Sequence, residues 1–308
     1  MTRVAAVDCG TNSLRLLIAE VDSAAGTLVD LERRMEIVRL GQGVDRTGRF
    51  HPEALRRTLD VTAEYAAACT AQRIERIRFV ATSASRDAAN RDAFVDGVRE
   101  RLGVEPEVIT GQEEAHLSFV GATRGLSVVP EGEVLVVDIG GGSTEVVLGV
   151  AGGQVQAARS VDVGCVRLLE RHGDGPDGVR AARVDIEAAL DDVERTVPVA
   201  RARALVGLAG TITTVTAHAL RLTAYDASRI HGASLPLAQA MAACDELITM
   251  SRERRAALPY LHPGRVDVIG AGALLWRCIM RRAGEAAGIT EAVTSEHDIL
   301  DGIAWSIA

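Results

Sequence analysis

The apolar positions of the chain repeat one pattern in two places. Residues 4–21 and 134–150 each begin with four consecutive apolar residues, continue through a turn of the form D-x-G-x-x-S, and end in a second apolar run. Apolar runs on either side of a glycine-rich turn predict two strands joined by that turn. The two copies lie about one domain length apart along the chain. The pattern therefore predicts two related units, each starting with the same strand, turn and strand.

Outside these hairpins, stretches with helical spacing of apolar residues alternate with short apolar runs that are typical of strands. This alternation favours a layered α/β architecture. A glycine- and aspartate-rich stretch, residues 173–178, is expected to form a surface loop. The predicted helices start at Pro52 and cover 90–102, 110–124, 184–196, the residues after Gly210, 236–250, 266–287 and the C-terminal end; the predicted strands cover 78–81, 107–109, 204–208 and 289–294.

Composition narrows the possible classes of function. With 308 residues, 47% of them hydrophobic, the chain is long enough for two domains of ordinary size. It shows neither a secretory nor a membrane-spanning pattern, so a cytoplasmic location is expected. The net charge of −8 argues against a general nucleic-acid binder.

All 34 basic residues are arginine, which limits the available chemistry. A Walker A loop and a Schiff-base site both require lysine, so a standard P-loop nucleotide hydrolase and Schiff-base catalysis are excluded. Phosphate has to be bound by backbone N–H groups, hydroxyls, a metal ion or the planar guanidinium of arginine. The five cysteines are scattered and never form a C-x-x-C pair, so we expect buried apolar side chains rather than disulfides or a structural zinc site.

The two D-x-G turns carry the candidate chemistry. Such a turn places several backbone N–H groups side by side, and its glycine lets the backbone approach a phosphate closely. Two copies indicate a pair of phosphate-binding loops that close on one phosphate from opposite sides.

The residues around these turns resemble the Ppx/GppA phosphatase family, which contains exopolyphosphatases and guanosine pentaphosphate phosphohydrolases. The resemblance extends over essentially the whole chain. It is carried by D-C-G-T-N-S-L-R-L-L-I from Asp8, A-T-S-A-S-R-D-A from Ala81, G-Q-E-E-A from Gly111, D-I-G-G-G-S-T-E from Asp138, G-L-A-G-T-I-T-T from Gly207 and G-A-G from Gly270.

The resemblance implies an actin-like (ribonuclease H-like) duplicated α/β fold, with two domains and an active-site cleft between them. Domain I is expected over residues 1–124, with a C-terminal helix at about 296–308 packing back on it, and domain II over 125–295. Longer family members continue into a further helical region. We therefore expect this shorter form to favour short polyphosphates.

Two adjacent glutamates open the helix predicted after Thr110. Thr110 and Glu113 have the spacing of a capping box, which gives Glu113 a structural role at the start of the helix. Glu114 has no such role. By resemblance, Glu114 is the family's catalytic glutamate, the general base that takes a proton from the attacking water.

The resemblance also implies that Asp138 and Glu145 act with Glu114 in catalysis. Carboxylates and phosphate oxygens in one cleft repel each other without a cation, so Asp8, Asp138 and Glu145 are expected to hold Mg²⁺, or Mn²⁺ in its place. The phosphate-binding residues are expected in the two turns, in the loop after the strand at 78–81, and in a third glycine-containing loop. They are Gly10, Thr11, Asn12, Ser13, Arg86, Gly140, Gly141, Gly142, Ser143, Thr144, Gly210 and Thr211.

These features predict an exopolyphosphatase, which hydrolyses the terminal phosphate of inorganic polyphosphate and releases orthophosphate. A guanosine pentaphosphate 5′-phosphohydrolase is the alternative within the same family, because the same cleft would serve it. An ATP-dependent small-molecule kinase and a non-enzymatic sensor of polyphosphate or guanosine alarmones are more distant alternatives. The predicted general base Glu114 favours water as the nucleophile, which argues against the kinase. A homodimer is expected from the resemblance, and neither nucleic acid nor a membrane is expected as a partner.

Overall fold

The computed structural model describes residues 1–74, 76–126, 132–152 and 154–308, and the chain divides into two compact units. Unit 1 consists of Met1–Gly121 and Ile299–Ala308, and unit 2 of Ala122–Asp298. The chain therefore leaves unit 1 once and returns to it for its last helix.

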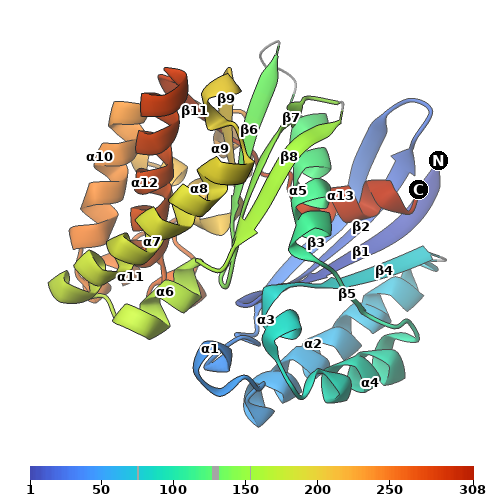
Figure 1. The fold of residues 1–308 in the computed structure, drawn as a ribbon. Helices are drawn as coiled ribbons and strands as arrows, with labels where there is room; N and C mark the ends of the chain where they lie inside the picture. The colour runs from blue at the N-terminus through green and yellow to red at the C-terminus, as the bar shows by residue number, and fades with distance from the viewer. Residues whose placement is uncertain (75, 127–131, 153) are drawn as a thin grey trace. The chain divides into compact units, whose positions relative to one another are not determined.

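Unit 1 is built on a five-stranded sheet (Figure 1, blue to cyan). The first three strands form an antiparallel meander, and the outer two run parallel to the first. In spatial order the strands are β3 (Thr27–Ile37), β2 (Ser13–Asp22), β1 (Thr2–Cys9), β4 (Arg76–Ala81) and β5 (Glu107–Val108).

Helices cover both faces of the unit 1 sheet, because β1 is apolar on both sides. Ala5 and Val7 face a core that includes side chains of α2 and α4, whereas Val4 and Ala6 face a core that includes α13. Figure 1 shows the red C-terminal helix α13 beside the blue strands. The helices of this unit are α1 (Val44–Thr47), α2 (Pro52–Ala71), α3 (Ser83–Asp87), α4 (Arg91–Leu102), α5 (Gly111–Gly125) and α13 (Ile299–Ser306), with the end of α5 passing into unit 2.

Unit 2 repeats the strand order and directions of unit 1 and adds one edge strand. Its first three strands again form an antiparallel meander, and the first strand is again followed by parallel neighbours. The prediction of a duplicated actin-like α/β fold is thereby confirmed. In spatial order the strands are β8 (Val155–Val161), β7 (Thr144–Val150), β6 (Glu133–Ile139), β9 (Ala204–Leu208), β11 (Glu291–Thr294) and β10 (Ser234–Pro236).

The main core of unit 2 joins one face of its sheet to a group of helices, among them α7, α8, α10 and α12. The largest fully buried side chain of this core is that of Trp276, on α12. The helical segments are α6 (Cys165–His172), α7 (Pro176–Thr196), η1 (Val199–Arg201), α8 (Ala209–Ala219), α9 (Ala227–Ile230), α10 (Leu237–Thr249), α11 (Arg252–Ala256), η2 (Pro263–Arg265) and α12 (Ile269–Ala287).

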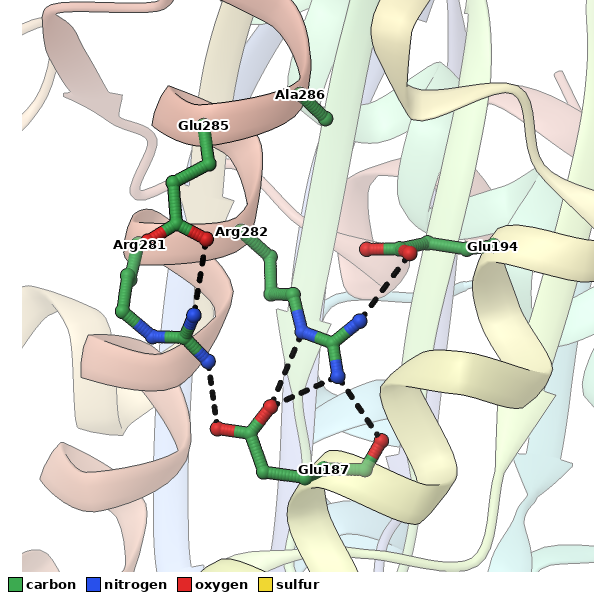
Figure 2. A pocket seen from close by; sticks show the side chains of 6 residues that line it. All are labelled: Glu187, Glu194, Arg281, Arg282, Glu285 and Ala286. Atoms are coloured by element: carbon green, nitrogen blue, oxygen red, sulfur yellow. Dashed lines mark hydrogen bonds and ion pairs between the residues drawn. The ribbon is translucent and has the colours of Figure 1, made fainter.

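On the surface of unit 2, α7 and α12 are joined by a network of ion pairs around a polar pocket (Figure 2). Glu187 accepts hydrogen bonds from Arg281 (2.6 Å) and from Arg282 (2.8 Å). Arg282 also pairs with Asp191 and Glu194, at 2.7 and 3.1 Å. The two guanidinium groups therefore face carboxylates, and we assign this pocket a structural role rather than one in binding a polyanion.

The described part of the chain contains no helix that combines the length and the apolar character needed to cross a membrane.

Candidate functional site

Both D-x-G turns have the same backbone closure. In unit 1 the N–H of Gly10 donates to the carbonyl oxygen of Ser13, and in unit 2 the N–H of Gly140 donates to that of Ser143, each at 3.0 Å. Each turn connects the first two strands of its unit, as the sequence predicted. The two hairpins thus share the same hydrogen bond across the turn.

The carbonyl groups of the unit 1 turn are bonded by a loop that follows β3. The backbone N–H groups of Gly41 and Arg39 donate hydrogen bonds of 2.8 Å to the carbonyl oxygens of Thr11 and Asn12. Across a trans peptide the C=O and the next N–H point in opposite directions. The N–H groups of Asn12 and Ser13 therefore point away from this loop, where an anion can accept from them.

The carbonyl groups of the unit 2 turn are bonded by the first turn of helix α6. The backbone N–H of Cys165 donates to Gly140 O at 3.1 Å, and those of Val166 and Arg167 donate to Gly141 O at 2.9 and 3.1 Å. These N–H groups are the ones that a helix start leaves without intrahelical partners. Helix α6 therefore fixes the turn from behind and leaves the opposite N–H groups of the glycine run for a ligand.

A side chain and a glycine complete this support. The Nε of Arg167 donates to the carbonyl oxygen of Gly142 at 2.7 Å. A Cβ on Gly164 would lie 2.5 Å from the carbonyl carbon and oxygen of Gly141, so only glycine allows α6 to approach so closely. Residues 164–167 carry no recognisable signal in the sequence, because their contribution is mainly through backbone groups. The hydroxyl of Thr144 donates to Val163 O at 2.6 Å, so this predicted phosphate ligand has a structural partner.

The predicted carboxylates lie at equivalent positions beside the turns. Asp8 lies in the buried part of β1, one residue before the strand ends, and accepts hydrogen bonds from Arg15. Asp138, on β6, lies directly across from Glu145 on β7, and Ser160 Oγ donates to Glu145 Oε1 at 2.7 Å. All three carboxylates are buried.

Asp138 and Glu145 fit a cation with oxygen ligands, since two buried carboxylates on neighbouring strands offer the donor type that Mg²⁺ and Mn²⁺ take. Among the residues that the structure describes, no group of three or more His, Cys, Asp or Glu side chains is arranged to hold a metal ion.

The two adjacent glutamates at the start of α5 have different surroundings. Thr110 Oγ1 accepts a hydrogen bond from the Glu113 N–H at 3.2 Å, as the capping-box spacing predicted. The Glu113 side chain is 42% exposed and pairs with Arg78 at 2.6 Å. Glu114 is buried, with a side-chain exposure of 10%, and its Oε2 pairs with Arg86 Nη1 at 2.7 Å. The structure therefore joins two predicted site residues, Glu114 and Arg86.

Arg86 lies in the short helix α3 rather than in the loop expected after the strand. Its Nη1 also donates to the carbonyl oxygen of Ile109 at 3.1 Å, next to the start of α5. This second contact fixes the guanidinium against the segment that carries Glu114. One guanidinium has five N–H donors, so it can hold Glu114 and still donate to a phosphate.

The third predicted loop forms the start of α8 in unit 2. Ala209 has a φ of +66°, a conformation that is rare for residues other than glycine. The guanidinium of Arg265 lies against Gly210, where a Cβ would come within 1.9 Å of it, and Thr211 packs against Gly272 in the same way. Arg265 was missed in the sequence, because one arginine among 34 has no local signal.

The two cysteines nearest the turns are poor nucleophiles. Burial raises the pKa of the Cys9 thiol well above its usual value, and Asp8 raises it further. Burial also raises the pKa of Cys165, and this outweighs the lowering by Arg265 and Thr211. All five cysteines lie in described segments and are free and buried, as expected from the sequence.

Comparisons with known proteins identify the family. The sequence pattern of the Ppx/GppA phosphatase family matches residues 17–306. The chain belongs to this family. Over its full length it is 51% identical to a protein named Exopolyphosphatase 2 from Mycobacterium tuberculosis, and the match covers 99% of that protein.

Other relatives extend the comparison. A solved structure described as an exopolyphosphatase-like protein is 42% identical, with a TM-score of 0.95 and coverage of 99% of this chain and 97% of the other. A Photobacterium profundum protein named Guanosine-5'-triphosphate,3'-diphosphate pyrophosphatase is 32% identical over 86% of this chain and 50% of its own length. The similar proteins thus include one named as an exopolyphosphatase and one named as a guanosine-5'-triphosphate,3'-diphosphate pyrophosphatase.

Proposed function

We propose that this protein is an exopolyphosphatase, a hydrolase that removes the terminal phosphate of inorganic polyphosphate and releases orthophosphate. One observation carries the choice of substrate: the 51% identity to Exopolyphosphatase 2 over the whole of this chain. The two supported turns and the buried Glu114–Arg86 pair agree with a phosphoanhydride substrate and with water as the nucleophile.

In this proposal each turn binds phosphate oxygens of the substrate through its backbone N–H groups, and Arg86 adds a guanidinium in unit 1. The backbone N–H groups of the turns are held in place before the substrate arrives, by residues 39–41 in unit 1 and by α6 in unit 2. The transition state of phosphoryl transfer is loose, so positioning and charge stabilisation make up most of the catalysis. The supported turns are suited to this role because they do not have to reorganise.

Glu114 is proposed as the general base. Its carboxylate is buried, and the Arg86 contact fixes its position. The carboxylate would orient a water molecule and take its proton during attack on the terminal phosphorus. The polyphosphate leaving group departs from the opposite side, and no covalent phospho-enzyme is needed.

Asp138 and Glu145 are proposed to hold a divalent cation, Mg²⁺ or Mn²⁺, together with substrate oxygens. When bound, such an ion neutralises charge on the phosphate oxygens. The sequence predicted Asp8 as a further ligand of the same ion; in the structure its Oδ2 accepts hydrogen bonds from Arg15.

The direct test measures phosphate release from tripolyphosphate, long-chain polyphosphate, guanosine pentaphosphate and ATP, with and without Mg²⁺. We expect the highest kcat/KM on polyphosphate. A higher kcat/KM on guanosine pentaphosphate would replace this proposal with the alternative activity of the family. No phosphate release from any of the four would contradict both.

Two finer proposals concern chain length and assembly. We propose that short polyphosphates are preferred, so that partial digestion of a long chain gives a ladder of intermediates on a gel; intact polymer beside free phosphate would contradict this. We also propose a homodimer, which light scattering at micromolar concentration would test, with a monomer mass as the contrary result.

A further inference from the structure

The loop that supports the unit 1 turn is itself held by an arginine of helix α2. Arg57 donates two hydrogen bonds to the carbonyl oxygen of Val38, from Nε at 3.2 Å and from Nη2 at 3.0 Å. Val38 is 1% exposed and lies between the end of β3 and residues 39–41. The guanidinium therefore fixes the chain at the point where it leaves the strand and enters the supporting loop.

Two peptide groups connect this guanidinium to the turn. The carbonyl of Val38 and the N–H of Arg39 belong to one peptide group, and this N–H donates to the carbonyl oxygen of Asn12 at 2.8 Å. The carbonyl of Asn12 and the N–H of Ser13 belong to a second one. In each trans peptide the N–H points away from the C=O. The hydrogen bonds therefore form one chain, which starts at Arg57 and leads to the N–H of Ser13.

This chain of hydrogen bonds has a geometric and an electrostatic effect. A guanidinium bound to the carbonyl of Val38 sets the plane of the peptide group whose N–H binds Asn12. Hydrogen bonds in a chain polarise one another, so a cation at one end makes the N–H at the other end a stronger donor. Arginine suits both effects, because its guanidinium stays ionised and presents its donors in a rigid fork.

A second side chain of α2 ties the helix to the same hairpin. The hydroxyl of Tyr65, a residue that is 1% exposed, donates to the carbonyl oxygen of Leu14 at 2.9 Å. Leu14 lies just after the turn and pairs with Glu36 of β3. Helix α2 therefore contacts both the strand that follows the turn and the loop that supports it, and this fixes the place from which Arg57 extends.

The turn of unit 2 has an arginine at the equivalent place. Asn12 and Gly142 are both the fifth residue of their D-x-G-x-x-S turns. The carbonyl of Gly142 accepts a hydrogen bond of 2.7 Å directly from Nε of Arg167, whereas the carbonyl of Asn12 is bound by a peptide N–H that Arg57 holds. Both turns therefore have a guanidinium behind the same carbonyl group, one in direct contact and one through a peptide group.

We propose that Arg57 is a positioning residue of the unit 1 turn. It orients the peptide group between Val38 and Arg39, and through the chain of hydrogen bonds its charge strengthens the binding of a phosphate oxygen by the N–H of Ser13. This inference rests on the proposed function, in which the turn binds phosphate oxygens of polyphosphate. Arg57 acts through two peptide groups, so it affects the affinity for substrate more than the chemical step.

Substrate affinity tests this role. We expect Arg57→Met to raise the KM for tripolyphosphate roughly tenfold, the lower end of what a lost hydrogen bond to a charged group costs. The change in kcat should be small, because the turn binds the ground state and the transition state alike. Arg57→Lys keeps the charge and should restore much of the affinity, whereas Arg57→Gln keeps only a neutral donor for Val38 and should restore less.

Arg56→Met is the matched control. This neighbour on α2 is 70% exposed, pairs with Asp60 at 2.9 Å, and its loss should leave the KM unchanged. An unchanged KM in Arg57→Met, or an equal rise in Arg56→Met, would refute the positioning role. Equal affinities of Arg57→Gln and Arg57→Lys would refute the part played by the charge.

Folding, loop order and function are measured separately. Thermal unfolding shows whether each variant is folded. Hydrogen exchange of the free protein, followed by mass spectrometry, should be faster at residues 38–42 in Arg57→Met than in Arg56→Met, and equal exchange would contradict the orientation of the loop by Arg57. Calorimetric titration with tripolyphosphate repeats the comparison as a binding measurement. If the wild type binds tripolyphosphate without hydrolysing it, the proposed function fails, while the affinities of the variants still decide the role of Arg57. No binding by the wild type would contradict both.

Discussion

In unit 1 the D-x-G turn is supported by the loop at residues 39–41, whereas in unit 2 the equivalent turn is supported by the first turn of helix α6. Both supports bond the carbonyl groups of the turn through backbone N–H groups, and both have a glycine at the point of closest approach, Gly41 and Gly164. The chemistry beside the two turns differs more than their backbones do. Unit 1 carries Arg15, Arg86 and Glu114, and unit 2 carries two opposed carboxylates.

The two copies of the duplicated fold thus share the backbone of the turn and differ in the side chains beside it. If both turns bind phosphate as proposed, their backbones are constrained to present N–H groups to it in both copies. The cross-strand partner of the aspartate differs between the copies: it is Arg15 in unit 1 and Glu145 in unit 2. The proposed general base, Glu114, belongs to unit 1, whereas the proposed metal ligands Asp138 and Glu145 belong to unit 2.

The largest expected effect concerns that base. Glu114→Gln keeps a hydrogen-bond acceptor for Arg86 but removes the proton acceptor, so we expect kcat to fall about 10²–10⁴-fold with little change in KM. Steady-state phosphate release measures this. Glu113→Gln is the matched control, because its side chain is exposed and pairs with Arg78 instead. A dead Glu113→Gln variant beside an active Glu114→Gln variant would place the base on the other residue.

The next effect concerns the carboxylate pair of unit 2. Chelation of divalent metal should abolish activity, and added Mg²⁺ should restore it. In Glu145→Gln the Mg²⁺ concentration for half-maximal activity should rise by roughly 10–100-fold, by analogy with lost partners around metal sites. Phosphate release measured against free Mg²⁺ gives this number. Full activity after exhaustive chelation would show that no dissociable metal is needed.

The third prediction compares the two supporting glycines. In Gly164→Ala the new Cβ meets the backbone of Gly141 at 2.5 Å, so the turn itself has to move. In Gly41→Ala it meets Cγ2 of Thr11 at 2.2 Å, a side-chain atom that can rotate away. Small displacements of binding groups can lower rates by about 10²-fold, so we expect a loss of this order in kcat/KM for Gly164→Ala and a smaller one for Gly41→Ala.

Thermal unfolding provides the control for this comparison, since both variants should remain folded at the assay temperature. The opposite order of the two losses would mean that the Thr11 side chain is held more rigidly than the backbone of the second turn.

The sequence predicted those parts of the fold that have strong patterns. Both hairpins carry apolar runs around glycine turns, and α4 ends before Gly103, whose φ of +76° favours glycine. Strands β3 and β8 were missed, because edge strands with many charged or half-exposed residues lack a clear apolar run. Helix α6 was missed because it is only eight residues long.

The sequence predicted the parts of the candidate site that consist of side chains. It did not predict the parts that consist of backbone groups. Glu114 and Arg86 come from motifs, and the structure pairs them. The support of the turns by residues 39–41 and 164–167 depends mainly on N–H groups, which every residue except proline has. The Asp8–Arg15 pair depends on the strand register, which places these two residues opposite each other. The register of a hairpin is set by its turn, so the motif alone does not predict the pair.

The smallest expected effect concerns stability, where the units also differ. Unit 1 ties its last helix to β3 through Arg33 and the buried Asp301, at 2.6 Å, whereas unit 2 joins α7 to α12 through the Glu187 network (Figure 2). Partial burial raises the pKa of Glu187, but hydrogen bonds from Arg282 and Arg281 outweigh this and lower it below its ordinary value of 4.5. A carboxyl with a lowered folded-state pKa stabilises the protein above its unfolded-state pKa, and this contribution is lost as the pH falls through the folded-state value.

We therefore expect Glu187→Gln to be less stable than the wild type at pH 7 by about 1 kcal/mol at most, or roughly 2–4 °C in Tm, because the network is partly exposed. The difference should shrink as the pH falls below about 4.5, where the wild type begins to lose the same charge. Denaturant unfolding at pH 7, 5 and 4 measures it. Glu285→Gln, which removes only an outer partner of Arg281, is the control and should have a smaller effect. A constant difference between wild type and Glu187→Gln at all three pH values would mean that Glu187 stabilises unit 2 through packing and not through its charge.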